Sequence, residues 1–225
     1  MTENTTVEPQ YDIVFRYKEE HGIARLGLMA NVGWVEDPKR LLFTLSRYKF
    51  VAKMFEGKDA VLEIGCADAF ATRVVKQHVN TLTAIDFDPA FIEDAKDRSA
   101  SNWPIKFDVH NIVEAPYPGS YNAAYMLDVL EHIDPADEHA VLGNVCKSLS
   151  EDGAFICGIP SLESQVYASP QSKAGHVNCK TAPDLKKVLQ QHFHNVFIFS
   201  MNDEIVHTGY HKMAHYVIGL CSGKK

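Results

Sequence analysis

The sequence lacks long apolar runs, paired cysteines and an excess of positive charge, and each of these absences narrows the range of functions. No apolar run approaches the roughly 20 residues of a membrane span, so we expect no membrane partner. Five scattered cysteines without a Cys-x-x-Cys pair indicate free thiols and a cytoplasmic chain. A net charge of -7 at pH 7 offers little attraction to a phosphate backbone, so we expect no nucleic-acid partner.

The remaining composition is that of an ordinary globular protein, with 46% hydrophobic and 23% charged residues. A length of 225 residues suits a single domain with a sizeable core. The segment before residue 58 is too short to bury a core of its own, and its aromatic side chains need a partner surface. We therefore expect one domain over residues 1–225, made of an N-terminal helical lid over 1–57 and a core over 58–225.

From residue 58 onward, short apolar segments of high β propensity alternate with helical segments. The expected helices cover residues 37–56, 70–79, 89–100, 134–149 and 182–193, and the expected strands cover residues 60–66, 81–88, 105–111, 121–130, 153–160, 196–203 and 215–222. This alternation predicts an α/β fold with a doubly wound, mainly parallel sheet, in which ligands bind at the carboxyl ends of the strands. The last two strands have no helix between them, so they should be antiparallel.

A tight turn follows the first expected strand. Gly65 and the small Ala67 would let a ligand approach the backbone there, although an ordinary strand-to-helix turn has the same pattern. Asp86 ends the second strand about 20 residues later, where an acid can bind both hydroxyls of a ribose. Because Asp88 is the better cap for the following helix, Asp86 is free for that role. Asn111 ends the third strand, where its amide either reads an adenine or lies in a solvated turn.

Together these residues resemble the class I S-adenosylmethionine-dependent methyltransferases. The first motif of that family, E/D-x-G-x-G-x-G, is matched by Glu63, Gly65, Ala67 and Ala69, with alanine in place of two glycines. Residues 114–133 resemble a later motif that closes on Leu-Glu-His. The resemblance covers about residues 58–220. It implies a Rossmann-like, seven-stranded mixed sheet of strand order 3-2-1-4-5-7-6, with the last strand antiparallel.

The resemblance also implies the cofactor, S-adenosyl-L-methionine, which leaves as S-adenosyl-L-homocysteine. Its methionine part would lie against the turn, its ribose against Asp86 and its adenine against Asn111, with the sulfonium beside Asp128. The full set of residues implied for the cofactor is Glu63, Gly65, Cys66, Ala67, Asp68, Asp86, Phe87, Asn111, Ile112, Leu127 and Asp128.

Two other classes of function compete with this interpretation. An NAD-type Rossmann oxidoreductase is the rival enzyme, but it predicts glycines at the turn and more sheet after the fifth strand. A non-catalytic, nucleotide-ligand-binding regulator is the second alternative, although it would normally need an additional effector or DNA-binding segment.

Two later segments carry residues that can activate an acceptor hydroxyl. The resemblance points to His176, in the long loop after the fifth strand, as a base or an acceptor-binding group; a surface histidine that organises the loop is the alternative. The loop between the last two strands should emerge on the cofactor face and is rich in acids and histidines, although a polar hairpin in water is its alternative. The candidate general bases are His176, His207 and Asp203.

Aromatic and basic side chains before residue 58 are candidates for binding the acceptor. Trp34 and Tyr48 can stack on it, and Arg47 can bind an anion. The alternative is a helix that packs its aromatic side on the sheet, which is favoured for Tyr48. The full substrate-binding set is Trp34, Arg47, Tyr48, His132, Glu204, Tyr210 and His211. The spacing of the acids and histidines over 203–211 is not zinc-like, so we expect no metal site.

The sequence therefore predicts methyl transfer to a small polar metabolite. Oxygen is the preferred acceptor, because several His and Asp candidates can take its proton. A sugar or sugar-linked group fits the polar loop between the last two strands. Nitrogen, carbon and protein acceptors remain open, and so does the oligomeric state.

Overall fold

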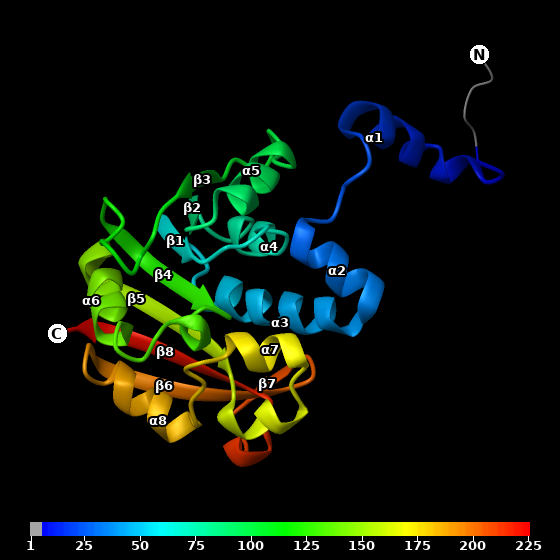
Figure 1. Cartoon of the computed structure of the whole chain (residues 1–225). Helices are drawn as coiled ribbons and strands as arrows, with labels where there is room; N and C mark the ends of the chain where they lie inside the picture. Colours follow the sequence, from blue (N-terminus) through cyan, green and yellow to red (C-terminus); the bar gives the residue numbers. More distant parts are fainter. Residues whose placement is uncertain (1–5) are drawn as a thin grey trace.

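The computed structural model of the chain describes residues 6–225, so the first five residues of the expected lid lie outside it. The chain forms one eight-stranded sheet with helices on both faces (Figure 1). The strands are β1 (Ala60–Ile64), β2 (Thr81–Asp86), β3 (Lys106–Val109), β4 (Tyr121–Leu127), β5 (Leu149–Pro160), β6 (Phe193–Asn202), β7 (Ile205–His207) and β8 (Tyr216–Lys224).

The strand order is β3-β2-β1-β4-β5-β8-β6-β7. Strands β1 to β5 pair in parallel, whereas β8 lies antiparallel between β5 and β6. This confirms the predicted order 3-2-1-4-5-7-6 with an antiparallel last strand, because β8 is the seventh expected strand. The expected count of seven strands was wrong. After β6 the chain turns at Asp203 and Glu204, and the next three residues pair with the end of β6 as the additional strand β7. So short an edge strand leaves no pattern that sequence periodicity can detect.

The helices over residues 6–225 are α1 (Ile13–His21), α2 (Leu28–Glu36), α3 (Lys39–Met54), α4 (Thr72–Lys76), α5 (Pro89–Asp97), α6 (Glu138–Ser148), α7 (Pro170–Gly175) and α8 (Ala182–Leu189), with short 3-10 turns η1 (Pro9–Tyr11), η2 (Leu130–His132), η3 (Leu162–Tyr167) and η4 (His211–Met213). None of them combines the length and the hydropathy that a membrane-spanning segment requires. Helix α8 ends before the predicted residue 193. His192, which follows it, is only 8% exposed, and its ring packs against that of His139.

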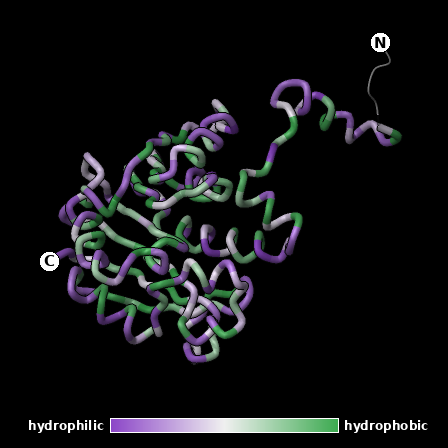
Figure 2. The backbone as a smooth tube through the Cα atoms, in the orientation of Figure 1, coloured by the Kyte–Doolittle hydropathy of each residue, from purple (hydrophilic) through white to green (hydrophobic). Residues whose placement is uncertain are grey.

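The two faces of the sheet carry different helices because successive residues of each strand point to opposite sides. On one face, side chains such as Met126 and Phe155 pack against α6 and α8. On the other face, Tyr125 and Ile156 pack against α3 and α4, and Ala84 packs against α5. In Figure 2 the strands are largely apolar, and the polar residues gather on the outer helices and loops. Both faces of the central strands are therefore buried.

The sequence did not predict α1 and α2, which precede the expected first helix. Figure 1 shows α1 standing away from the sheet, whereas α2 lies against the end of α3. The N-terminus of α2 is fixed by two carboxylates of the core: Asp68 accepts a hydrogen bond from the Ala30 N–H at 2.7 Å, and Asp94 accepts one from the Leu28 N–H at 3.3 Å. Negative charge at a helix N-terminus is favourable. Because Asp68 belongs to the turn after β1, α2 is tied to the predicted cofactor turn.

We predict that Gly27→Ala loosens this attachment. A Cβ at Gly27 would lie 2.3 Å from the Asp68 Cγ, so α2 would have to move off its carboxylate. Losing an N-terminal cap costs about 1 kcal/mol, and amide hydrogen exchange over 28–36 should become roughly fivefold faster.

Gly33→Ala is the matched control in the same helix. Its Cβ would meet the Leu41 side chain at an ordinary 3.7 Å, and alanine favours the helix, so exchange should slow or stay the same. Unchanged exchange in Gly27→Ala would show that Asp68 does not hold α2.

Candidate active site

The turn after β1 has an unusual backbone. Gly65, Ala67 and Ala69 have φ values of 71°, 44° and 51°, in the left-handed region that favours glycine. For the two alanines this conformation costs about 1–2 kcal/mol each. At Gly65 the approach of the segment after β4 adds a second constraint, because a Cβ there would lie 2.3 Å from the Cγ2 of Val129. The turn thus keeps the shape of a glycine-rich loop, and it lies directly against the residues that follow β4.

The carboxylate at the end of β2 anchors this turn. Asp86 is 6% exposed, and its two oxygens accept hydrogen bonds from the N–H groups of Ala67 at 2.8 Å and Asp88 at 3.0 Å. A carboxylate oxygen can accept more than one hydrogen bond, so Asp86 can also bind the two hydroxyls of a ribose. The next side chain, Phe87, is 71% exposed and free to cover a bound ring.

The predicted adenine site at the end of β3 is locally ordered. The Asn111 amide oxygen accepts a hydrogen bond from the Val113 N–H at 3.1 Å, and its nitrogen donates to Glu114 at 2.9 Å. Ile112 is buried in the core. The adenine role of this segment stays a prediction.

Glu63 is the buried carboxylate of β1. It is 1% exposed, and one of its oxygens accepts a 2.6 Å hydrogen bond from the Tyr48 hydroxyl, whereas the other has no partner among the described residues. Burial raises the pKa of Glu63 to about 7, a shift that the hydroxyls of Thr72, Tyr48 and Tyr125 oppose. Tyr48 was expected to stack on an acceptor. The structure instead buries it in the core as the partner of Glu63, because the polar end of a buried tyrosine needs a hydrogen bond.

An ion pair joins the N-terminal segment to the end of β4. The Arg47 guanidinium contacts the Asp128 carboxylate at 2.6 Å and lies 3.8 Å from the centre of the Tyr216 ring. Asp128 adopts a left-handed φ of 56°, which turns the chain at the carboxyl end of the strand. This geometry places a fixed, partly buried charge pair where the resemblance puts the sulfonium.

A second polar cluster follows three residues later. Glu131 is fully buried, and neither of its carboxylate oxygens has a hydrogen-bond partner within residues 6–225. Burial and the nearby Asp128 raise its pKa well above its usual value. The rings of His132 and His176 lie beside it, with their centres 5.1 Å apart. The fold thus brings together Asp128, His132 and His176 as predicted candidates and adds Glu131, which sequence reasoning missed.

The hairpin after β6 arranges its polar side chains differently. Asp203 and Glu204 form an exposed turn, with Asp203 at a φ of 49°. Both ring nitrogens of His207 are engaged inside the hairpin, one with the Asn202 side chain at 2.7 Å and the other with the Gly209 N–H at 2.9 Å.

Two further predicted residues belong to the same loop. Tyr210 is 63% exposed, and His211 lies 3.7 Å from Glu163. The structure therefore does not bring this loop's predicted residues into the cluster around Glu131, and their roles in catalysis or binding stay predictions.

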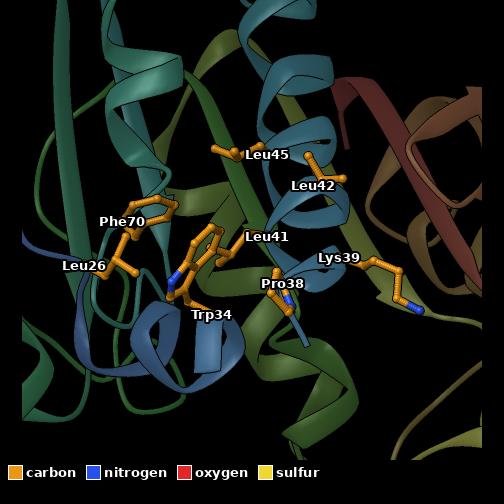
Figure 3. A pocket seen from close by; sticks show the side chains of 8 residues that line it. All are labelled: Leu26, Trp34, Pro38, Lys39, Leu41, Leu42, Leu45 and Phe70. Atoms are coloured by element: carbon orange, nitrogen blue, oxygen red, sulfur yellow. The ribbon is translucent and has the colours of Figure 1, made fainter. Parts of the chain in front are cut away.

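A cavity of about 490 Å³ lies between α2, α3 and the segment after the cofactor turn. Figure 3 shows Trp34 at its centre, with Leu26 and Phe70 on one side and Leu41 on the other, while the amino group of Lys39 points away. Leu45 and Leu41 lie on the same face of α3 as Tyr48, about one and two turns earlier, respectively. Trp34, which is predicted to stack on the acceptor, thus lines an apolar cavity beside the cofactor turn.

Other residues of the site also escaped sequence reasoning. Gln165 accepts a hydrogen bond from the His176 ring, and His215 packs its ring 5.4 Å from that of Phe43. Tyr125 and Tyr216 lie in apolar strands and look like ordinary core residues in the sequence. Among the residues that the sequence analysis missed, Glu131 could have been found from the sequence, because it belongs to the same Leu-Glu-His motif as His132.

Comparison with known proteins agrees with this resemblance. Residues 61–153, less than half of the chain, match the family model of a methyltransferase domain. This match is consistent with the resemblance to the class I S-adenosylmethionine-dependent methyltransferases. S-adenosylmethionine is the methyl donor of such domains, and the buried free oxygen of Glu63, the close approach at Gly65 and the exposed Phe87 beside Asp86 fit such a ligand. The two alternatives drawn from the sequence are not favoured.

Solved structures show the same fold at low identity. The N-methyltransferase NodS from Bradyrhizobium japonicum WM9, solved with S-adenosyl-L-homocysteine, is 19% identical, with a TM-score of 0.62 over 84% of this chain and 89% of that chain. A chain of the complex between the Haloferax volcanii Trm112 methyltransferase activator and the putative methyltransferase is 12% identical, with a TM-score of 0.67 over 90% of this chain and 100% of that chain. A putative O-methyltransferase from Nostoc punctiforme is 16% identical, with a TM-score of 0.59 over 79% of this chain and 56% of that chain. No curated protein matches the sequence.

We predict that Ala67→Gly and Ala69→Gly each stabilise the methyltransferase by roughly 0.5–1 kcal/mol, because relief of the left-handed strain exceeds the entropy that glycine loses on folding. Urea unfolding measures the change. Ala71→Gly is the control: Ala71 is buried with an ordinary φ of -88°, so glycine there should destabilise. Destabilisation by all three substitutions would contradict strain in the turn.

We predict that Glu63 makes stability depend on pH. Its pKa of about 7 in the folded chain lies above its usual 4.5, so its favourable contribution is complete below pH 4.5 and is lost as the pH rises through 7. This pKa difference changes the free energy of unfolding by about 3 kcal/mol between low and high pH. Glutamine has no charge to bury, so the stability gained by Glu63→Gln over the parent chain should be larger at pH 8 than at pH 5 by about that amount. Urea unfolding of both proteins at the two pH values measures it. An equal difference at the two pH values would exclude an unusual pKa.

Proposed function

We propose that the methyltransferase transfers the methyl group of S-adenosylmethionine to a hydroxyl of a small metabolite, and that Asp128, Glu131, His132 and His176 surround that hydroxyl. A sugar or sugar-linked group is the acceptor that we favour. A small molecule is a better partner than a nucleic acid, because the net charge of -7 disfavours a phosphate backbone.

The observation that carries this proposal is the convergence of these four side chains at the carboxyl end of β4. Gly65 of the cofactor turn approaches Val129, which lies between Asp128 and Leu130. The backbone oxygen of Glu131 accepts hydrogen bonds from the N–H groups of Val177 and Asn178, at 2.8 and 2.9 Å. The loop that carries His176 is thereby fixed beside the cofactor turn, where an acceptor must lie to meet the methyl group.

The histidine geometry supports oxygen as the acceptor atom. Nδ1 of His176 lies 2.8 Å from the side-chain amide oxygen of Gln165. This oxygen can only accept a hydrogen bond, so Nδ1 of His176 carries the hydrogen. Nε2 then has a free lone pair for a hydroxyl proton. Bound S-adenosylmethionine supplies a methyl carbon activated by the sulfonium. The hydroxyl oxygen forms a bond to that carbon while the carbon–sulfur bond breaks and its electron pair goes to sulfur.

The apolar cavity beside Trp34 suggests how the rest of the acceptor binds. It lies along the face of α3 that also carries Tyr48, next to Phe70 of the cofactor segment. A hydroxyl-bearing group attached to an apolar remainder would place its polar end at the histidines and its apolar end in the cavity. We also propose that the N-terminal segment, which supplies Trp34 and Arg47, covers the bound molecules as a lid within a single domain.

We predict that His176→Ala lowers turnover roughly 10²–10⁴-fold, the effect of a lost general base, with little change in cofactor affinity. Asp86→Ala should do the reverse and weaken S-adenosyl-L-homocysteine binding by about 1–3 kcal/mol. Transfer of labelled methyl to a panel of sugars and hydroxylated amphiphiles measures the first, and calorimetry measures the second.

His194→Ala is the control, because His194 is exposed on β6 outside the site. It should leave both quantities unchanged. Labelled product in which the methyl group is on nitrogen, or full turnover in His176→Ala, would rule out the proposed hydroxyl transfer.

A further inference from the structure

We propose that Glu131, His132 and His176 form a binding site for a divalent transition-metal ion. Each of these side chains offers one ligand atom, and the three atoms all lie within 4.8 Å of one another. Two imidazole nitrogens and one carboxylate oxygen are a donor set that binds zinc and ferrous ions in proteins.

The two histidines are oriented as metal ligands are. His132 Nδ1 lies 2.9 Å from the backbone oxygen of Gly175, and His176 Nδ1 lies 2.8 Å from the side-chain oxygen of Gln165. Both partners are acceptors, so each Nδ1 carries the hydrogen and each Nε2 keeps its lone pair. Hydrogen bonds of this kind, from the non-ligating nitrogen to a carbonyl, usually fix metal-binding histidines.

The state of Glu131 supplies the second and independent indication. Its side chain is fully buried, and none of the residues from 6 to 225 offers a hydrogen bond to either carboxylate oxygen. The nearest guanidinium, that of Arg47, is already paired with Asp128 at 2.6 Å. A buried carboxylate is costly without a compensating charge or hydrogen bond, and a metal ion would supply that compensation.

The backbone holds the three ligands together before any metal binds. Two N–H groups directly after His176 donate to the backbone oxygen of Glu131 at 2.8 and 2.9 Å. At Gly175 a Cβ would lie 3.2 Å from the His132 ring, so the loop approaches that ring closely. The ligands therefore come from two segments, 44 residues apart, that are fixed to each other.

Three protein ligands leave coordination positions open, and His132 is exposed to solvent on one side of the cluster. An oxygen of the acceptor can occupy an open position, where coordination lowers the pKa of the hydroxyl. With a metal bound, His176 would act as a ligand in place of the general base described above, and the hydroxyl proton would leave to solvent. Activation of the acceptor rests on the proposed hydroxyl transfer, whereas metal binding itself does not.

Metal binding is measured on the full chain without any acceptor, after treatment with EDTA. We expect one equivalent of Zn²⁺ or Co²⁺ in calorimetry, and no displacement by millimolar Mg²⁺, which prefers oxygen ligands. Glu131→Gln, His132→Ala and His176→Ala should each weaken binding by about 100-fold or more, and Gln165→Ala by about 10–100-fold, as expected for loss of the group that orients a ligand.

His194→Ala is the matched control and should bind metal like the parent chain. His132 is exposed, so His132→Ala tests the site even if a substitution at the buried Glu131 disturbs folding. The proposal is overturned if the parent chain binds no Zn²⁺ or Co²⁺, if the three ligand variants bind as tightly as the control, or if Mg²⁺ displaces the metal. Metal binding without methyl transfer to any hydroxyl would refute the proposed acceptor but leave the metal site intact.

Discussion

The burial of three carboxylates near the carboxyl ends of neighbouring strands is the constraint around which the site is built. Glu63, Asp86 and Glu131 are each less than 9% exposed, and a buried carboxylate is costly unless hydrogen bonds or cations compensate it. Each is treated differently: Asp86 accepts backbone N–H groups, Glu63 accepts a tyrosine hydroxyl, and Glu131 has no partner within the described residues. This edge of the sheet therefore concentrates acidic side chains, but the raised pKa values of Glu63 and Glu131 reduce the negative charge that these two carry.

Helix α3 compensates one of these three carboxylates, Glu63, and also pairs with Asp128. Tyr48 and Arg47 are neighbours on α3, yet they reach two different carboxylates, Glu63 and Asp128, because successive helical residues point about 100° apart. In the opposite direction, Asp68 of the core holds the N-terminus of α2. The N-terminal segment thus stabilises the cofactor turn, and the turn stabilises the N-terminal segment. A movement of one must therefore shift the other. That mutual dependence is the physical basis for expecting a lid.

The sequence was sufficient for what depends on local pattern and on topology. The alternation of apolar segments predicted the mainly parallel sheet, the missing helix before the last strand predicted the antiparallel β8, and the family resemblance implied the strand order. It also placed Asp86 at the end of β2, beside the turn that it holds. It was not sufficient for contacts between distant segments, such as His132 with His176, or for the direction in which Tyr48 points. The acids and histidines of residues 203–211 were predicted to act on the acceptor because so many of them lie in one loop. Most of them form hydrogen bonds within their own hairpin or lie exposed in its turn.

The two alanines of the cofactor turn show how the site combines strain with binding. Their left-handed backbone is unfavourable, so the turn must be held by interactions outside it. One of these is the hydrogen bond from Ala67 to Asp86, the carboxylate that is predicted to bind the ribose. A ligand that binds Asp86 therefore acts on the group that stabilises the conformation of the turn. The same turn contains Asp68, which anchors α2. The conformation of the turn and the attachment of the N-terminal helices are linked through these two aspartates, which lie 18 residues apart in the sequence. A cofactor bound at the predicted ribose site would act on both.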